Sequence, residues 1–200
     1  MNLLSNTHDR TVGQRLIFFT RDSDRSLLDL KGKRTYGVVG WRARHNPDPI
    51  DLIKEKEYDV LDYFEPVVVK PNGINSHMVI NPGEYYIVAS AEVLYVPPDL
   101  NIEMEAYSQI GFSGMAHFAG FFDNGWKGKI VGELRSDEPT GIKLHHGMPL
   151  SKLRVYRTIT PDKVYGAEQS GAHYQFQSGP TPSKQFKPIN YRTIFEMSQE

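Results

Sequence analysis

The chain has 200 residues, a formal net charge of −1 and no cysteine. This length fits one domain, and the near-zero charge gives no general attraction to nucleic acid or to an acidic membrane. Without cysteine there are no disulfides, no thiol catalysis and no cysteine-bound zinc. No apolar run approaches the ~20 residues of a membrane span, and residues 1–15 lack a signal-peptide pattern. We therefore expect a cytoplasmic protein with neither a nucleic-acid nor a membrane partner.

Two segments favour a helix. The first is 48–62, where Asp48 could cap the helix and Pro49 could occupy its first position. The second is a single weak turn at 194–198. Elsewhere, 17 glycines and 13 prolines divide the chain into short pieces, so long helical periodicity is scarce.

From residue 65 onward the pattern predicts short strands separated by turns. The expected strands, each bounded by Gly, Pro or Asp, are 66–70, 77–80, 85–96, 129–135, 141–144 and 151–157. Strands of this length and spacing predict an all-β sandwich or barrel. We expect one domain over residues 1–200, with 166–190 forming a polar C-terminal arm outside the core.

One carboxylate lies inside an otherwise apolar strand. Alternation places Glu133 on the same face as Val131 and Arg135, opposite Leu134. Two interpretations are open. Glu133 is either a surface carboxylate that could pair with Arg135, or a general acid/base in a partly dry pocket, where loss of hydration raises its pKa toward neutrality.

The turn Asp123-Asn124-Gly125-Trp126 precedes this strand. Asn-Gly supplies the positive φ that a tight turn needs. The turn is either a plain hairpin with an anchoring Trp126, or one wall of a pocket that binds a base.

Histidine offers little for a metal site. His145 and His146 are neighbours on a predicted strand, so their side chains point to opposite faces. His117 and His173 are isolated in the sequence. We predict no metal ion held by these side chains.

The arm carries several aromatic and amide side chains, among them Tyr165, His173, Tyr174 and Gln177. A tail of this composition is often simply mobile. The same residues also suit a lid that closes over a polar ligand, and the sequence leaves both possibilities open.

Taken in order, these pieces resemble the deoxycytidine triphosphate deaminases of the trimeric dUTPase superfamily, over about residues 62–187. The shared motifs are Asp-x-Gly-Trp-x-Gly at 123–128, Glu133 at the family's distance from Asp123, and Leu-x-x-Gly-Met at 144–148. The tail matches at Tyr165, Tyr174, Gln177, Ser183 and Lys184. The similarity is closest to one module of the atypical long deaminases, through EYYIVASAEVLYVPPD, IEMEAY, HFAGFFDNGW and ELRSDE.

The resemblance implies a distorted antiparallel β-barrel of the dUTPase-like, jelly-roll type with a few short helices. It implies a homotrimer with active sites between subunits. The reaction would be hydrolytic, zinc-independent deamination of dCTP or a related deoxycytidine nucleotide, with Glu133 as the general acid/base. Mg²⁺ would bind through the triphosphate of the nucleotide.

Further residues are implied to bind the substrate: Ser108, Gln109, Phe121, Asp123, Trp126, Tyr165, His173, Gln177 and Lys184. Ordinary members carry Arg-Ser-Ser-Leu-Ala-Arg about twenty residues before the turn, whereas residues 104–114 here contain neither an Arg nor a Ser pair. Neutral groups replace bidentate Arg contacts poorly, so the phosphate level of the substrate is left open.

Two other functions are compatible with this fold. A dUTP diphosphatase, or a bifunctional deaminase-diphosphatase, would use Asp123 to orient a water at the α-phosphate. A catalytically silent nucleotide-binding regulator would fit the missing Arg-Ser-Ser motif.

Overall fold

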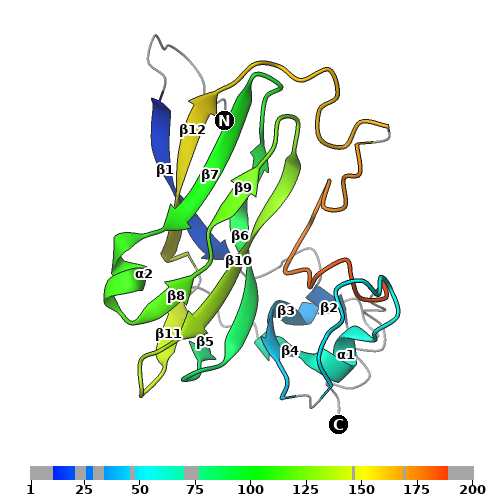
Figure 1. Cartoon of the computed structure of the whole chain (residues 1–200). Coiled ribbons are helices and arrows are strands. Elements are labelled where there is room, and N and C mark those ends of the chain that lie inside the picture. The colour runs from blue at the N-terminus through cyan, green and yellow to red at the C-terminus, as the bar shows by residue number, and fades with distance from the viewer. Residues whose placement is uncertain are drawn as a thin grey trace.

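The computed structural model describes residues 11–20, 26–28, 34–45, 48–69, 77–145, 147–168 and 170–188. Strands dominate these residues, with two short helices, as Figure 1 shows. In chain order the elements are β1 (Thr11–Thr20), β2 (Ser26–Leu28), β3 (Arg34–Ala43), α1 (Val60–Tyr63), β4 (Phe64–Val69), β5 (His77–Ile80), β6 (Tyr85–Tyr95), β7 (Leu100–Ala106), α2 (Ser108–Phe112), β8 (Met115–His117), β9 (Gly120–Phe122), β10 (Lys127–Ser136), β11 (Ile142–His145) and β12 (Pro149–Arg157). None of the helices described is long and apolar enough to cross a membrane. The helical turn expected at 194–198 lies outside the described residues.

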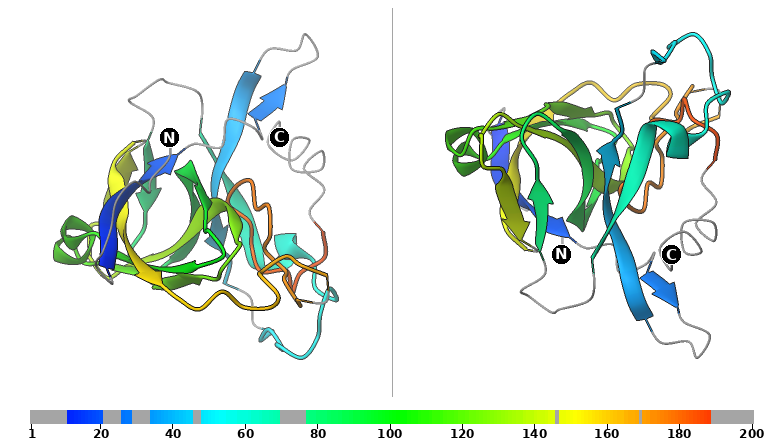
Figure 2. Two further views of the ribbon diagram at one scale, coloured as in Figure 1. Left: turned by 90° about the horizontal axis from the view of Figure 1, so that it is seen from above. Right: turned by 90° about the horizontal axis from the view of Figure 1, so that it is seen from below.

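The strands form a 10-stranded sheet and a separate two-stranded sheet of β11 and β5. Long antiparallel ladders join β10 to β6, β1 to β12 and β12 to β7. Seen from above and below, these strands close around a central core, while β2, β3 and β4 extend to one side (Figure 2). The expected all-β class and distorted antiparallel barrel are therefore confirmed.

The prediction of a helix over 48–62 is wrong for most of that range. Only the four-residue α1 forms, and Asp59 rather than Asp48 caps it, because the Asp59 side chain accepts a hydrogen bond from the Leu61 amide at 2.9 Å. Leu52 and Ile53 are 79% and 90% exposed, so the segment has no buried apolar face to stabilise a helix.

Side chains also compete for the backbone of this segment. The Asp51 carboxylate accepts from the Ile53 amide at 3.0 Å. The Gln185 side chain donates to the carbonyls of Leu52 and Lys54, at 2.6 and 2.7 Å. The backbone groups that a helix would pair internally are thus bound by the C-terminal arm and by a local turn.

The C-terminal arm is part of the core at its end, contrary to the sequence-based expectation. Phe186 is 5% exposed and belongs to a buried cluster with Trp41, Val60, Tyr63, Phe64 and Ile87. The Trp41 indole donates to the carbonyl of Pro180 at 2.6 Å. Figure 2 shows the arm, in orange to red, running beside β3, β4 and α1.

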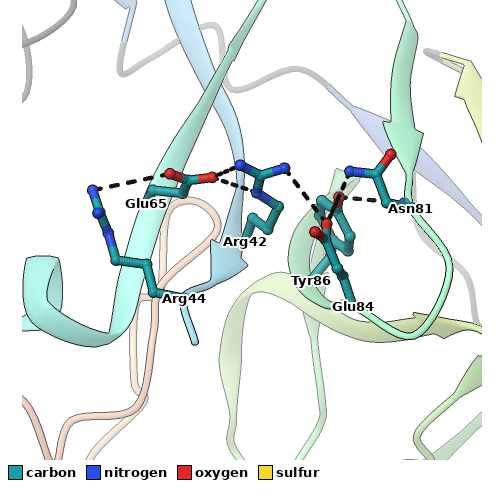
Figure 3. Close-up of polar contacts among 6 residues, drawn as sticks. All are labelled: Arg42, Arg44, Glu65, Asn81, Glu84 and Tyr86. Carbon is teal, nitrogen blue, oxygen red and sulfur yellow. Dashed lines mark hydrogen bonds and ion pairs between the residues drawn. The ribbon is translucent and has the colours of Figure 1, made fainter. Parts of the chain in front are cut away.

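A polar network fixes the turn between β5 and β6, as Figure 3 shows. The Glu84 carboxylate accepts from the Tyr86 hydroxyl at 2.6 Å and from the Asn81 amide at 2.9 Å. Arg42 lies 3.5 Å from Glu84 and also forms an ion pair with Glu65. The network joins β3 and β4 to the residues that begin β6.

This network predicts a loss of stability in acid. Partial burial raises the pKa of Glu84, but the hydrogen bonds from Tyr86 and Asn81 and the charge of Arg42 outweigh it, so the pKa is lowered overall from 4.5. A carboxyl whose pKa is lowered in the folded state stabilises the protein at pH values above its ordinary pKa. This contribution disappears as the pH falls through the pKa of the folded state. The melting-temperature advantage of wild type over Glu84→Gln, followed from pH 7 to about pH 3, should therefore shrink below about pH 4.5. An advantage that stays constant over this range would contradict the assignment.

Candidate functional site

A cavity of about 550 Å³ opens between β10, β6, the turn after β9 and the C-terminal arm. Aromatic rings make up much of its wall, and two carboxylates, Asp123 and Glu133, face it. The sequence-predicted site residues that line it are Glu133, Phe121, Asp123, Trp126, Tyr165 and Gln177. Segments far apart in the sequence therefore converge on one cavity.

The alternation of β10 places Glu133 at this cavity. Leu134 is fully buried on the inner side, while Glu133 lies opposite Ile87 of β6 on the outer side. Glu133 is solvent-exposed in the single chain, yet the surrounding side chains displace enough water to raise its pKa above 4.5. Loss of hydration is the one cause of this shift, so the surroundings favour the protonated form of the carboxyl more than water does.

The suggested pairing of Glu133 with Arg135 is wrong. The Arg135 guanidinium binds the Asp137 carboxylate at 3.1 Å instead. Within the part of the chain that the structure describes, the Glu133 carboxylate accepts no hydrogen bond and forms no ion pair. It is thus available to a ligand or a water in the cavity.

The turn at 123–126 both anchors Trp126 and forms part of the cavity wall. Gly125 has a φ of +87°, and a Cβ there would lie 2.7 Å from Val164, so glycine is needed. The Asn124 side chain fixes the turn by donating to the carbonyls of Pro98 and Leu100 and to the Thr158 hydroxyl, at 2.7–2.8 Å. Trp126 is 5% exposed.

The arm is attached to β10 by Gln175, which the sequence analysis did not single out, and by Gln177, which it did. Gln175 accepts from the Lys127 amide at 2.8 Å and donates to the carbonyls of Gly125 and Tyr165 at 3.0 and 3.1 Å. The Gln177 carbonyl accepts from the Lys129 amide at 2.7 Å. These contacts close one side of the cavity. The Gln177 side chain, predicted to bind substrate, also donates to the Lys129 carbonyl at 3.3 Å.

Four predicted substrate-binding residues lie elsewhere in this chain. Ser108 and Gln109 are exposed on α2, and His173 and Lys184 are exposed on the arm, and none of these lines the cavity. No Lys, Arg or His is found among the described residues that do line it. The part of the chain that the structure describes therefore offers this cavity no cation for a phosphate group.

Metal-binding side chains do not gather in the described residues, where no group of three or more His, Asp or Glu could hold an ion. His77 and His145 pack ring to ring at 5.2 Å, and His146 lies outside the described residues. His117 is held by the Phe118 carbonyl and the Ser151 hydroxyl, each at 2.8 Å, and burial lowers its pKa. Both ring nitrogens of His117 therefore have partners within the protein.

The raised pKa of Glu133 predicts a cost in stability. At pH values above the ordinary pKa of 4.5, the Glu133 carboxyl releases its proton more readily in the unfolded chain than in the folded chain. The ionised carboxylate therefore lowers the free energy of unfolding. We expect Glu133→Gln to raise the melting temperature at about pH 7. The difference from wild type should close as the pH falls below about 4.5, where the carboxyl is protonated in both states. A melting temperature lowered by the substitution at neutral pH would refute this prediction.

Comparison with known proteins identifies consistent relatives. The family model described as 2'-deoxycytidine 5'-triphosphate deaminase, C-terminal domain, matches residues 8–186. A dCTP deaminase, dUMP-forming, of Parafrankia sp. (strain EAN1pec) is 33% identical over 175 residues, covering 86% of this chain and 82% of the relative. The enzyme of the same description from Thermobifida fusca (strain YX) is 30% identical over 169 residues, covering 76% and 86%.

The structural comparison agrees with the sequence comparison. The crystal structure of 2'-deoxycytidine 5'-triphosphate deaminase from Agrobacterium tumefaciens matches with a TM-score of 0.59 and 25% identity, over 72% of this chain and 42% of that chain. This chain thus spans less than half the length of that solved chain.

Proposed function

The chain belongs to the family of the 2'-deoxycytidine 5'-triphosphate deaminase C-terminal domain, and from that premise we propose that it deaminates dCTP or a related deoxycytidine nucleotide hydrolytically. The observation that carries the proposal is Glu133, a carboxylate that lines an aromatic-walled cavity, has no partner among the described residues and has its pKa raised by loss of hydration. The cavity is large enough for a nucleoside, and its rings suit a flat pyrimidine.

In this mechanism Glu133 takes a proton from a water as the water oxygen bonds to C4 of the cytosine ring. The carboxyl then passes that proton to ring nitrogen N3. It next moves the proton of the new C4 hydroxyl to the amino nitrogen, so that the bond between C4 and this nitrogen breaks, ammonia leaves and C4 becomes a carbonyl. The net reaction consumes one water and converts the cytosine to uracil. Proton transfer by a positioned group typically contributes about 10²- to 10⁴-fold to such a step.

We propose that the phosphate contacts come from a second copy of the chain in a homotrimer. The described lining of the cavity contains no cation, while a triphosphate carries several negative charges. Exposed apolar side chains such as Val93 and Tyr95 on β6, 62% and 57% exposed, are compatible with a covered face. Sedimentation as a monomer at micromolar concentration would exclude this assembly.

Mg²⁺ is proposed as the counterion of the nucleotide, where it would neutralise phosphate charge. The chain has no cysteine, and its described residues gather no set of three metal-binding side chains, so the donors fit an ion carried in by the substrate. Activity should therefore survive a chelator selective for transition metals once Mg²⁺ is restored, as measured by ammonia release. Stoichiometric zinc whose removal abolishes activity would contradict this prediction.

A cytoplasmic location belongs to the same proposal.

A second reaction has a specific motive, because the relatives are named as dUMP-forming. Forming dUMP from dCTP requires loss of pyrophosphate as well as of the amino group. Asp123 lines the same cavity and is our candidate for orienting a water at the α-phosphate.

The deciding experiment incubates the protein with dCTP, dCMP or dUTP plus Mg²⁺ and measures ammonia and pyrophosphate separately. Deamination predicts ammonia from a cytosine nucleotide, and the bifunctional reaction adds pyrophosphate from dCTP. Pyrophosphate from dUTP without ammonia from dCTP or dCMP would indicate a diphosphatase, and nucleotide binding with neither product would indicate a silent regulator. Either result would overturn the proposed deamination.

A further inference from the structure

Tyr85 lies beside Glu133, although the sequence analysis assigned it no role. In the antiparallel ladder of β6 and β10, Tyr85 is opposite Arg135 and Ile87 is opposite Glu133. Tyr85 and Glu133 are therefore diagonal neighbours on one face of the sheet, within reach of an aromatic side chain. Both residues line the cavity.

The surroundings hold the Tyr85 ring in place. It packs against the rings of Phe64 and Phe118, with centroids 6.3 and 6.1 Å away. Its chain neighbours Glu84 and Tyr86 belong to the network of Figure 3, which secures the start of β6. A phenol fixed from several sides can present its hydroxyl at a defined point of the cavity.

The Tyr85 hydroxyl and the Glu133 carboxylate share an environment but do not hydrogen-bond to each other. Burial, and then the charge of Glu133, raises the pKa of Tyr85, so the phenol keeps its proton at neutral pH. Neither side-chain group has a hydrogen-bond partner among the described residues. Two unsatisfied polar groups that face one cavity at close range suit a bridging water.

We propose that Tyr85 and Glu133 hold the attacking water between them, which makes Tyr85 a positioning residue for the reaction. The proposal rests on the proposed deamination. The Tyr85 hydroxyl donates to the water oxygen, and the water gives one hydrogen to Glu133. One lone pair of the water then remains directed at the carbon that carries the amino group. Tyr85 stays neutral throughout and keeps its own proton.

The test is Tyr85→Phe, which keeps the ring between Phe64 and Phe118 and removes only the hydroxyl. We expect kcat to fall about 10- to 100-fold with KM nearly unchanged, in line with losing one hydrogen bond to the reacting group. In a plot of kcat/KM against pH, the acid limb should move to higher pH. The reason is that Glu133 loses the Tyr85 hydroxyl, which favours the charged form of the carboxyl. Loss of ring packing alone would instead admit water to Glu133 and move that limb to lower pH, because burial is what raises the pKa of this carboxyl.

Tyr86→Phe is the matched control. It makes the same change on the next residue, whose hydroxyl binds Glu84 in the network away from the cavity. It should lower the melting temperature and leave the acid limb in place. Wild-type kcat and an unmoved limb in Tyr85→Phe would overturn the proposal.

A second measurement separates this proposal from the proposed function. The pKa of Glu133 can be titrated by NMR with a carboxyl-labelled side chain, with no substrate present. A higher Glu133 pKa in Tyr85→Phe than in wild type supports the pairing even if no nucleotide is deaminated, and an equal pKa refutes the pairing even if deamination is observed.

Discussion

Replacing Glu133 with glutamine is expected to lower the turnover number about 10²- to 10⁴-fold, the range that a positioned proton-transfer group supplies. Glutamine has nearly the same shape and keeps a hydrogen-bonding end, so nucleotide affinity should change little. Because Glu133 has no partner among the described residues, removing its charge leaves none of their charged side chains without a partner. The measurement is single-turnover ammonia release together with a direct binding titration.

Glu105→Gln provides the matched control for this experiment. Glu105 lies on β7 outside the cavity lining and forms a 3.0 Å ion pair with Arg154, in which both side chains are over 40% exposed. Exposed pairs of this kind contribute little, so the variant should keep wild-type turnover. Near-normal turnover of Glu133→Gln would remove Glu133 from the mechanism.

The second large effect is on stability. Phe186→Ala is expected to lower the free energy of unfolding by about 3–5 kcal/mol, the usual cost of deleting a buried aromatic ring. Phe186 lies 5.6 Å, ring to ring, from both Tyr63 and Phe64, and it also lines the cavity. The loss should appear in urea unfolding, followed by the fluorescence of Trp41 in the same cluster.

Phe176→Ala is the control for the arm as a whole. Phe176 is 71% exposed, so its truncation should change the free energy of unfolding by less than about 0.5 kcal/mol. If the two variants were equally stable, the end of the arm would not be part of the core. If Phe186→Ala alone is unstable, the arm is a structural element as well as a wall of the site.

The strands around the site could be predicted because their signals are local. Alternation in β10 placed Leu134 inside and Glu133 outside, and the turn at Gly125 follows from the need for positive φ. The spacing from Asp123 to Glu133 also carried the family resemblance, which the comparisons confirm. These features depend on residues close together in the sequence.

The remaining features depend on contacts between distant residues. Tyr85 meets Glu133 through the register of β6 and β10, which no local pattern fixes. The helix expected at 48–62 fails because Gln185, over 130 residues later, binds its carbonyls. Phe186 looked like part of a polar tail until the fold placed it beside Trp41 and Phe64.

One turnover of dCTP in ¹⁸O-labelled water, with the product analysed by mass spectrometry, distinguishes deamination of the base from hydrolysis at the phosphates. Hydrolytic deamination at this site predicts one ¹⁸O atom in the base of the product, at the carbon that lost its amino group, and almost none in the Glu133→Gln variant. A cytosine base that stays intact, with ¹⁸O found in phosphate alone, would show that the protein does not deaminate dCTP.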